Sequence, residues 1–228
     1  MIGFFDSGMG GLTVLSVFKT VFPEAATLYY ACNLRGPIGR LSQKELREIW
    51  KRAKGVFESH HVSHIIIACH TMSSALFCEE EEATLISNPA LIENLPDVAL
   101  LATRATLESG LYQERCPQIA LAIDGSDLVA HIEDGKTPWD RLQSLLFPII
   151  GHGRIRHIYL GCTHFPFLRP AMEKVLKQHG LSPAWINPAE SLPLLSRSPD
   201  SFLSGPDLFI SDTPSPFAQK LHAKIVKK

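Results

Sequence analysis

The stretch HIIIACHT (residues 64–71) runs four apolar residues into a cysteine, and HIYLGCTH (157–164) repeats this plan later in the chain. In both, an apolar strand leads to a small residue, a cysteine, and then threonine and histidine in either order. Open α/β sheets bind their ligands at the carboxyl ends of strands. The repeat therefore predicts two similar halves that face one cleft, with Cys69 and Cys162 at the strand ends.

Outward from these stretches, short apolar strands alternate with amphipathic segments. Strands are expected at 1–6, 26–31, 64–68, 97–103, 118–123, 155–162 and 208–211. Helices are expected within 7–22, at 42–60, 74–82, 104–116, 127–135 and 140–150, and at the C-terminal end. The alternation predicts an α/β fold with mainly parallel sheets. We assign residues 1–92 plus 186–228 to a first α/β domain and 93–185 to a second.

The composition argues against several classes of protein. The 228 residues include 22 basic and 23 acidic side chains, and a net charge of −1 gives no electrostatic reason to bind nucleic acid or an anionic membrane. No apolar run approaches the roughly 18 residues of a membrane span, and the first residues lack the charged region of a signal peptide. We therefore expect a cytoplasmic protein.

Five cysteines, in a reducing compartment and without C-x-x-C spacing, argue against a disulfide framework or a structural zinc site. Free cysteine is among the most buried residue types, so each one could simply fill the core. Cys78 and Cys116 fit that interpretation. For Cys69 and Cys162 both packing and chemistry stay open, because each follows a strand and precedes polar side chains.

Two thiols on opposite sides of a substrate could remove a proton from one face of a carbon and deliver one to the other face. That chemistry is a racemisation or epimerisation, and it needs one thiolate and one thiol. A nearby cation or helix N-terminus should then lower the pKa of one thiol. His70 and His164 are the candidates for this cation.

The opening segment FFDSGMGGLTVL (4–15) is rich in glycine but matches neither the Walker pattern nor the full G-x-G-x-x-G pattern. Asp6 could point into the cleft, with Ser7 and the glycine N–H groups holding a carboxylate. It could also cap the following helix, which the spacing alone favours.

Three segments, IGFFDSGMGGLTVL (2–15), IIIACHTMSSA (65–75) and LGCTHFPFLRP (160–170), resemble the signature segments of the cofactor-independent glutamate racemases, in the aspartate/glutamate racemase superfamily. The resemblance extends from Ile2 to about Leu192. It implies two similar α/β halves with the active site between them. It also implies isomerisation of L- and D-glutamate by two bases, without pyridoxal phosphate or metal, to supply D-glutamate for peptidoglycan.

The resemblance also implies roles for individual residues. Cys69 and Cys162 correspond to the two catalytic thiols. Asp6 would support Cys69 and His164 would support Cys162, each helping its thiol exchange a proton. Glu133 corresponds to an acidic residue of the family near the second thiol.

Residues implied to hold the substrate's carboxylates and amino group are Ser7, Gly39, Thr71 and Thr163. Three positions depart from the family: Ile38 replaces a tyrosine beside the substrate carboxylate, His70 replaces an asparagine that contacts the substrate, and Cys32 replaces an acid near the site. Losing the tyrosine hydroxyl removes a charged hydrogen bond worth about 1.5–3 kcal/mol. A charged His70 would lower the pKa of Cys69, whereas its bulk would obstruct the substrate amine.

The leading hypothesis is a glutamate racemase whose partner is a small-molecule amino acid. The departures keep two alternatives open: a racemase of aspartate or another amino acid, and a binding or regulatory protein that has lost turnover. Assembly into a homodimer is left open.

Overall fold

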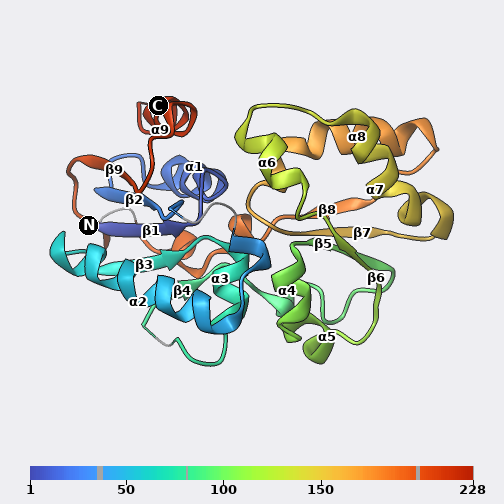
Figure 1. Cartoon of the computed structure of the whole chain (residues 1–228), viewed down its shortest axis with the longest axis horizontal. Coiled ribbons are helices and arrows are strands. Elements are labelled where there is room, and N and C mark those ends of the chain that lie inside the picture. Colours follow the sequence, from blue (N-terminus) through green and yellow to red (C-terminus); the bar gives the residue numbers. More distant parts are fainter. Residues whose placement is uncertain (35–37, 81, 199–200, 228) are drawn as a thin grey trace.

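The computed structural model describes residues 1–34, 38–80, 82–198 and 201–227. Two sheets lie side by side, each made of parallel strands with helices on both faces (Figure 1). The predicted α/β fold with mainly parallel sheets is confirmed. A single antiparallel bridge, between Ala25 and Ser204, lies outside the named strands of the described chain.

The first sheet has the strand order β4-β3-β1-β2-β9. Its strands are β1 (Ile2–Asp6), β2 (Thr27–Ala31), β3 (His64–Ile67), β4 (Thr84–Leu85) and β9 (Asp207–Ser211). Its helices are α1 (Leu12–Val21), α2 (Gln43–Ser59), α3 (His70–Ala75) and α9 (Pro216–Ile225). The C-terminal strand thus returns to pair with β2, beside the N-terminal half of the chain.

The second sheet has the order β6-β5-β7-β8. Its strands are β5 (Val98–Ala102), β6 (Ile119–Asp124), β7 (His157–Gly161) and β8 (Ala184–Ile186). Its helices are α4 (Arg104–Glu108), α5 (Leu111–Arg115), α6 (Leu128–Glu133), α7 (Trp139–His152) and α8 (Arg169–Gln178).

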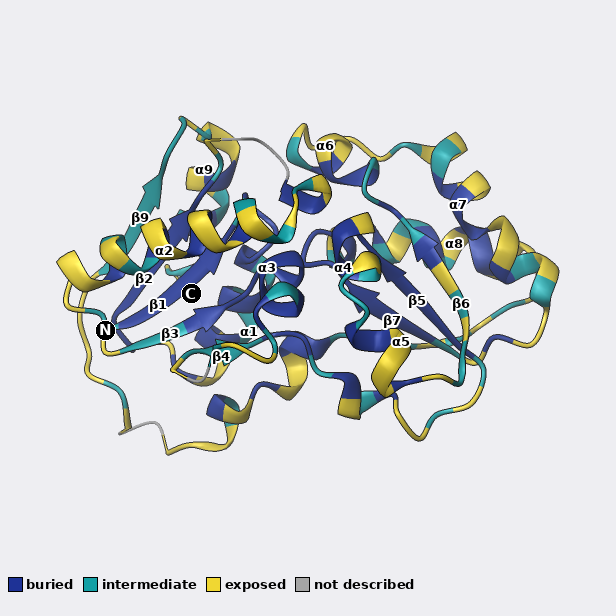
Figure 2. Ribbon diagram, turned by 60° about the horizontal axis from the view of Figure 1, so that its bottom comes forward, coloured by how far each residue is buried: buried dark blue, intermediate teal, exposed yellow. Residues whose placement is uncertain are grey.

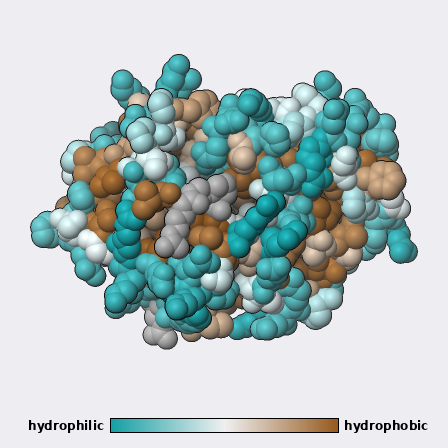
Figure 3. Space-filling model, viewed as in Figure 1, coloured by the Kyte–Doolittle hydropathy of each residue, from teal (hydrophilic) through white to brown (hydrophobic). Residues whose placement is uncertain are grey.

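Each sheet is buried on both faces, as parallel sheets require. One core packs β1 and β2 against α1 and α9, and another packs the opposite face against α2. The second sheet repeats this arrangement, with α6, α7 and α8 on one face and α5 on the other. In Figure 2 the central strands β1, β2 and β5 are buried, the edge strands β6 and β9 are partly exposed, and the helices keep exposed outer faces. Figure 3 shows hydrophilic and hydrophobic residues interspersed on one face of the molecule.

The longest helix of the described chain, α2, begins as its sequence indicates. Ser42 and Glu45 form a capping box, in which the serine hydroxyl accepts from the Glu45 N–H and the glutamate carboxylate accepts from the Ser42 N–H. The predicted apolar stripe, which includes Leu46, Trp50 and Phe57, is buried.

Two helix predictions were wrong. The helix expected over 74–82 is α3, which begins at His70 directly after the strand and ends at Ala75. The acids that follow do not extend it, because Glu79 pairs with Arg47 and Glu80 accepts from the Trp50 indole, both on α2. The helix expected over 104–116 is divided at Gly110, whose φ of 77° lies in the left-handed region.

The expectation for Cys78 was also wrong, since this residue is exposed, whereas Cys116 is buried as expected. The sequence reasoning also missed β4, β8 and α8. No helix in the described part of the chain is long and apolar enough to cross a membrane.

A buried ion pair anchors the returning strand β9. Lys19 Nζ on α1 lies 2.6 Å from Asp207 Oδ1 and donates to the carbonyls of Ala25, at 2.7 Å, and Pro23, at 3.2 Å. Thr27 donates to the same aspartate. The pair therefore joins α1, β2 and β9.

We expect Lys19→Met to lower the free energy of unfolding by about 3–5 kcal/mol, because it leaves the buried Asp207 charge without its partner. Urea unfolding followed by circular dichroism measures the loss. Lys220→Met on the exposed side of α9 is the matched control and should change stability by less than about 0.5 kcal/mol. Equal losses for the two variants would contradict the assignment.

Candidate active site

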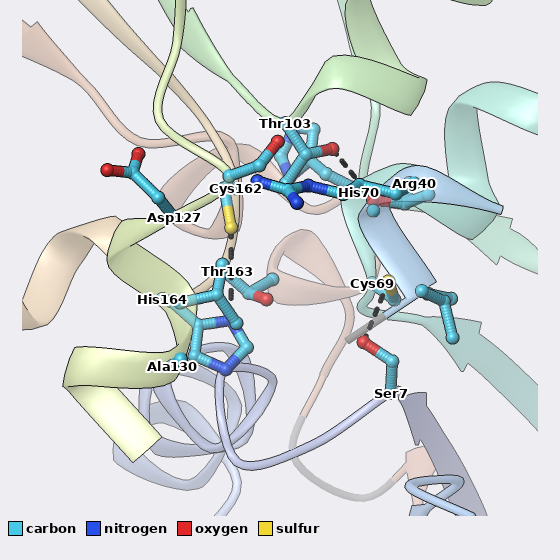
Figure 4. A pocket seen from close by; sticks show the side chains of 15 residues that line it. Ser7, Arg40, Cys69, His70, Thr103, Asp127, Ala130, Cys162, Thr163 and His164 are labelled. Atoms are coloured by element: carbon cyan, nitrogen blue, oxygen red, sulfur yellow. Dashed lines mark hydrogen bonds between the residues drawn. The ribbon is translucent and has the colours of Figure 1, made fainter. Parts of the chain in front are cut away.

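A cavity of about 390 Å³ lies where the carboxyl ends of strands from both sheets meet (Figure 4). Its walls follow the ends of β1, β2, β3, β5, β6 and β7, as expected for ligand sites of open α/β sheets. The sequence-predicted residues that line it are Ser7, Ile38, Gly39, Cys69, His70, Thr71, Cys162, Thr163 and His164. Asp6, Glu133 and Cys32 are not among the described lining residues.

The two thiols come from different sheets and approach the cavity from opposite sides (Figure 4). Cys69 follows β3, and its sulfur lies 3.6 Å from Ser7 Oγ. Cys162 follows β7, and its sulfur lies 3.8 Å from His164 Nδ1. Both cysteines are almost fully buried. A ligand in the cavity would therefore meet one thiol on each side.

The surroundings of Cys69 favour its neutral thiol. Burial raises the pKa of Cys69 to about 12, and the negative charge of Asp6 adds to this, against weaker opposing hydrogen bonds from the Met72 N–H and Ser7. Although Cys69 precedes helix α3, the helix N-terminus does not outweigh the cost of burying a thiolate.

The surroundings of His164, in contrast, favour its charged form. Burial by itself lowers the pKa of a histidine, but the contacts with Cys162 and Glu133 outweigh it and raise the pKa of His164 well above its usual value. His164 Nε2 donates to Glu133 Oε1 at 2.6 Å, which leaves Nδ1 directed at the Cys162 sulfur. The protonated imidazole therefore places a positive charge beside that sulfur. The site thus holds its two thiols in contrasting environments.

Asp6 is the last residue of β1 and directly precedes the glycine-rich loop. Its carboxylate accepts from the Gly8 N–H at 3.0 Å and from the Thr163 hydroxyl at 3.2 Å. Burial raises the pKa of Asp6, partly offset by the charge of His164. The interpretation of Asp6 as a helix cap is wrong, since the N-cap residue of α1 is Gly11 and no side chain caps that helix. Asp6 instead connects the two halves of the protein.

His70 does not carry the positive charge considered for it. The side chain is buried, and neither ring nitrogen has a hydrogen-bond partner in the described structure. Burial lowers the pKa of His70 to about 3, so the ring is neutral at physiological pH. Its ring packs edge-on against Tyr159, with centroids 6.0 Å apart. A neutral imidazole offers the cavity one donor and one acceptor but no charge.

Of the remaining predicted residues, Ile38, Gly39 and Thr71 line the cavity and Cys32 does not. The hydroxyls of Thr71 and Thr103 are 2.9 Å apart, and Gly39 lies against Thr103, so these three line one side together. Ile38 is buried and contributes an apolar surface. Cys32 lies elsewhere: burial raises its pKa to about 11, and it interacts with Tyr30 and Asp212.

Sequence reasoning missed several lining residues, among them Arg40, Thr103, Ser126 and Asp127. Thr103 directly follows β5, and Ser126 and Asp127 follow β6 closely, so the strand-end rule applied to every strand would have found them. Among the described residues, no group of three or more His, Cys, Asp or Glu side chains is arranged to hold a metal ion.

Comparisons with known proteins give a consistent result. The glutamate racemase of Thermus thermophilus is 32% identical over 188 residues, which cover 77% of this chain and 71% of that protein. The glutamate racemase of Streptococcus equi subsp. equi is 29% identical over 202 residues, covering 77% of this chain and 73% of that one.

The crystal structure of glutamate racemase from Francisella tularensis in complex with D-glutamate superimposes with a TM-score of 0.80. It is 22% identical and covers 100% of this chain and 93% of that one, so it shows a shared fold. No protein-family model matches the chain.

The neutral state of His70 gives a prediction about stability at low pH. In the folded protein the ring stays neutral down to a pKa of about 3, whereas in the unfolded chain it binds a proton below about pH 6.5. The unfolded state is therefore favoured as pH falls, by about 1.4 kcal/mol per pH unit.

His70→Asn removes this contribution, while the other histidines remain in both proteins. The difference in unfolding free energy, wild type minus variant, should thus fall by about 1.6 kcal/mol between pH 6.5 and pH 5. Urea unfolding at pH 8, 6.5, 5.5 and 5 measures it. A difference that does not change with pH would show that His70 binds a proton as readily in the folded protein as in the unfolded chain.

Proposed function

The chain belongs to the glutamate racemase family, and from that premise we propose that it interconverts L- and D-glutamate with Cys69 and Cys162 as the two bases. The observation that carries the proposal is the pair of buried thiols on opposite sides of one cavity, in contrasting electrostatic environments. A two-base racemisation needs one thiolate and one thiol at the start of each turnover.

In the proposed mechanism the α-carbon of the substrate lies between the two sulfurs. The Cys162 thiolate, beside the protonated His164, takes the α-proton, and the electron pair of the broken C–H bond spreads into the α-carboxylate. The Cys69 thiol then delivers its proton to the opposite face of the carbon. This step leaves Cys162 as a thiol, Cys69 as a thiolate and the substrate inverted. The other enantiomer reacts by the same steps in reverse.

We assign the α-carboxylate and amino group to the polar groups beside the thiols. Ser7 lies within 3.6 Å of the Cys69 sulfur, and Thr163 directly follows Cys162. Thr71 and Gly39 contribute from the wall that they share with Thr103. Asp6 holds the Thr163 hydroxyl, and its negative charge raises the pKa of Cys69, so it keeps that thiol protonated until the proton is needed.

The proposal needs neither pyridoxal phosphate nor a metal, because the protein's own groups supply both proton transfers. The D-glutamate formed would serve peptidoglycan synthesis in the cytoplasm. We also propose that residues 1–92 with 186–228 and residues 93–185 act as two domains that enclose the substrate.

We expect Cys69→Ser and Cys162→Ser each to abolish racemisation, because a serine hydroxyl is far less acidic than a thiol and cannot replace it in the proton exchange. Exchange of the α-hydrogen of L- and D-glutamate with solvent deuterium, read by NMR, is the direct measurement. Cys78→Ser is the matched control, since that cysteine is exposed and outside the cavity, and should keep full activity. Wild-type protein that binds glutamate yet shows no exchange would refute the proposal.

Glu133→Gln tests the support for His164. The variant removes a partner that raises the pKa of His164, so the imidazole should lose its proton at lower pH. We expect the rate of exchange at pH 8 to fall roughly 10- to 100-fold, and the alkaline limb of the pH–rate profile to move to lower pH.

Profiles of kcat/KM from pH 6 to 10 measure this shift, with Glu108→Gln on the exposed side of α4 as the control. An unchanged alkaline limb with a lowered rate would mean that Glu133 acts only on the shape of the site.

A further inference from the structure

The cavity contains a guanidinium that the proton transfers do not use. Arg40 ends the short helical turn Ile38–Arg40 after β2 and lines the cavity. In Figure 4 its side chain extends from the first half across the cavity toward the side of Cys162. It forms no ion pair and no side-chain hydrogen bond with any described residue. Five N–H donors are thus available to a ligand.

The other charged groups at the cavity already have partners. Asp127 is the carboxylate among the described lining residues, and Arg141 binds both of its oxygens, with Nε at 2.5 Å and Nη2 at 3.1 Å. His164 contacts Cys162 through Nδ1 and Glu133 through Nε2, so both of its ring nitrogens have partners. Among the described residues that line the cavity, the unmatched charge is therefore the positive charge of Arg40.

Arg40 and the two thiols differ in burial. The thiols are almost fully buried, whereas Arg40 lines the same cavity but is an exposed residue. A substrate with its α-carbon between the sulfurs would therefore extend its far end toward the guanidinium. Ile38 and Val129, both buried in the cavity wall, offer apolar contact to the methylene groups between those ends.

An α-amino acid carries one positive and one negative charge on its α-carbon substituents, and an acidic side chain adds a second negative charge. We propose that Arg40 binds this side-chain carboxylate and so restricts the enzyme to amino acids with an anionic side chain. The planar guanidinium suits a carboxylate because it can donate two parallel hydrogen bonds. The inference rests on the proposed racemase function and adds its specificity determinant.

Glutamate and glutamine, which have nearly the same shape and differ in side-chain charge, provide the test. The proteins compared are wild type, Arg40→Gln, Arg40→Lys and, as a matched loss of an exposed arginine away from the cavity, Arg154→Gln. The measurement is kcat/KM for α-hydrogen exchange with glutamate, aspartate and glutamine. Where glutamine is not turned over, its inhibition constant against glutamate replaces kcat/KM.

We expect Arg40→Gln to lower kcat/KM for glutamate roughly 10- to 100-fold while the value for glutamine changes less than about threefold. Arg40→Lys should keep part of the activity, since it retains the charge but not the paired donors. Arg154→Gln should match the wild type. Aspartate should follow glutamate if its shorter side chain still reaches Arg40.

Three results would overturn the inference. Equal losses for glutamate and glutamine would place Arg40 on the α-carboxylate. Equal losses for Arg40→Gln and Arg154→Gln would mean that Arg40 acts only through long-range electrostatic attraction of the anionic substrate. No loss at all would leave Arg40 without a role in binding. If the wild type exchanges none of the three amino acids, the proposed function fails, and calorimetric binding of glutamate and glutamine to wild type and Arg40→Gln still decides the role of Arg40.

Discussion

The close approach of the loop at residues 7–11 to the second half of the protein is the constraint on which the site depends. A Cβ at Gly8 would lie 2.2 Å from Glu133 Oε1, and one at Gly10 would lie 2.4 Å from His164 Nδ1. The Met9 N–H between them donates to Glu133 Oε1 at 2.9 Å. A side chain at Gly8 would displace the Glu133 carboxylate, and one at Gly10 would displace the His164 ring and the Thr163 hydroxyl. The glycines that resemble a phosphate loop in the sequence thus serve to join the two walls of one cavity.

That junction also explains the contrast between the thiols. The loop brings Asp6 to Thr163 and lies against the His164–Glu133 pair, so negative charge lies near Cys69 and positive charge near Cys162. Enantiomers have equal free energies in water, so kcat/KM must be equal in the two directions however unlike the two thiols are. In the proposed mechanism the asymmetry can therefore change kcat and KM for each enantiomer only together, by the same factor.

Local sequence pattern was sufficient to locate the cavity and the buried face of α2, although it missed α8. Strand ends marked by Cys69 and Cys162 located the cavity, and the stripe on α2 predicted its buried face. What it could not supply depends on tertiary surroundings. The neutral state of His70 follows from burial against Tyr159, a residue of the other sheet. The sequence predicts α3 too far along the chain because the acidic run resembles an exposed helix face. In the structure Glu79 and Glu80 instead interact with side chains of α2.

The departures from the family that the sequence revealed are better understood as a redistribution of hydrogen-bond donors than as a loss of them. Ile38 lacks a hydroxyl, yet Arg40, two residues further along the same turn, brings a charged donor to the same cavity. A neutral His70 keeps one donor and one acceptor, the same kinds of group as the amide it replaces. Burying both ring nitrogens without partners costs about 1–3 kcal/mol each. A bound substrate that makes a hydrogen bond to one of them would recover part of that cost.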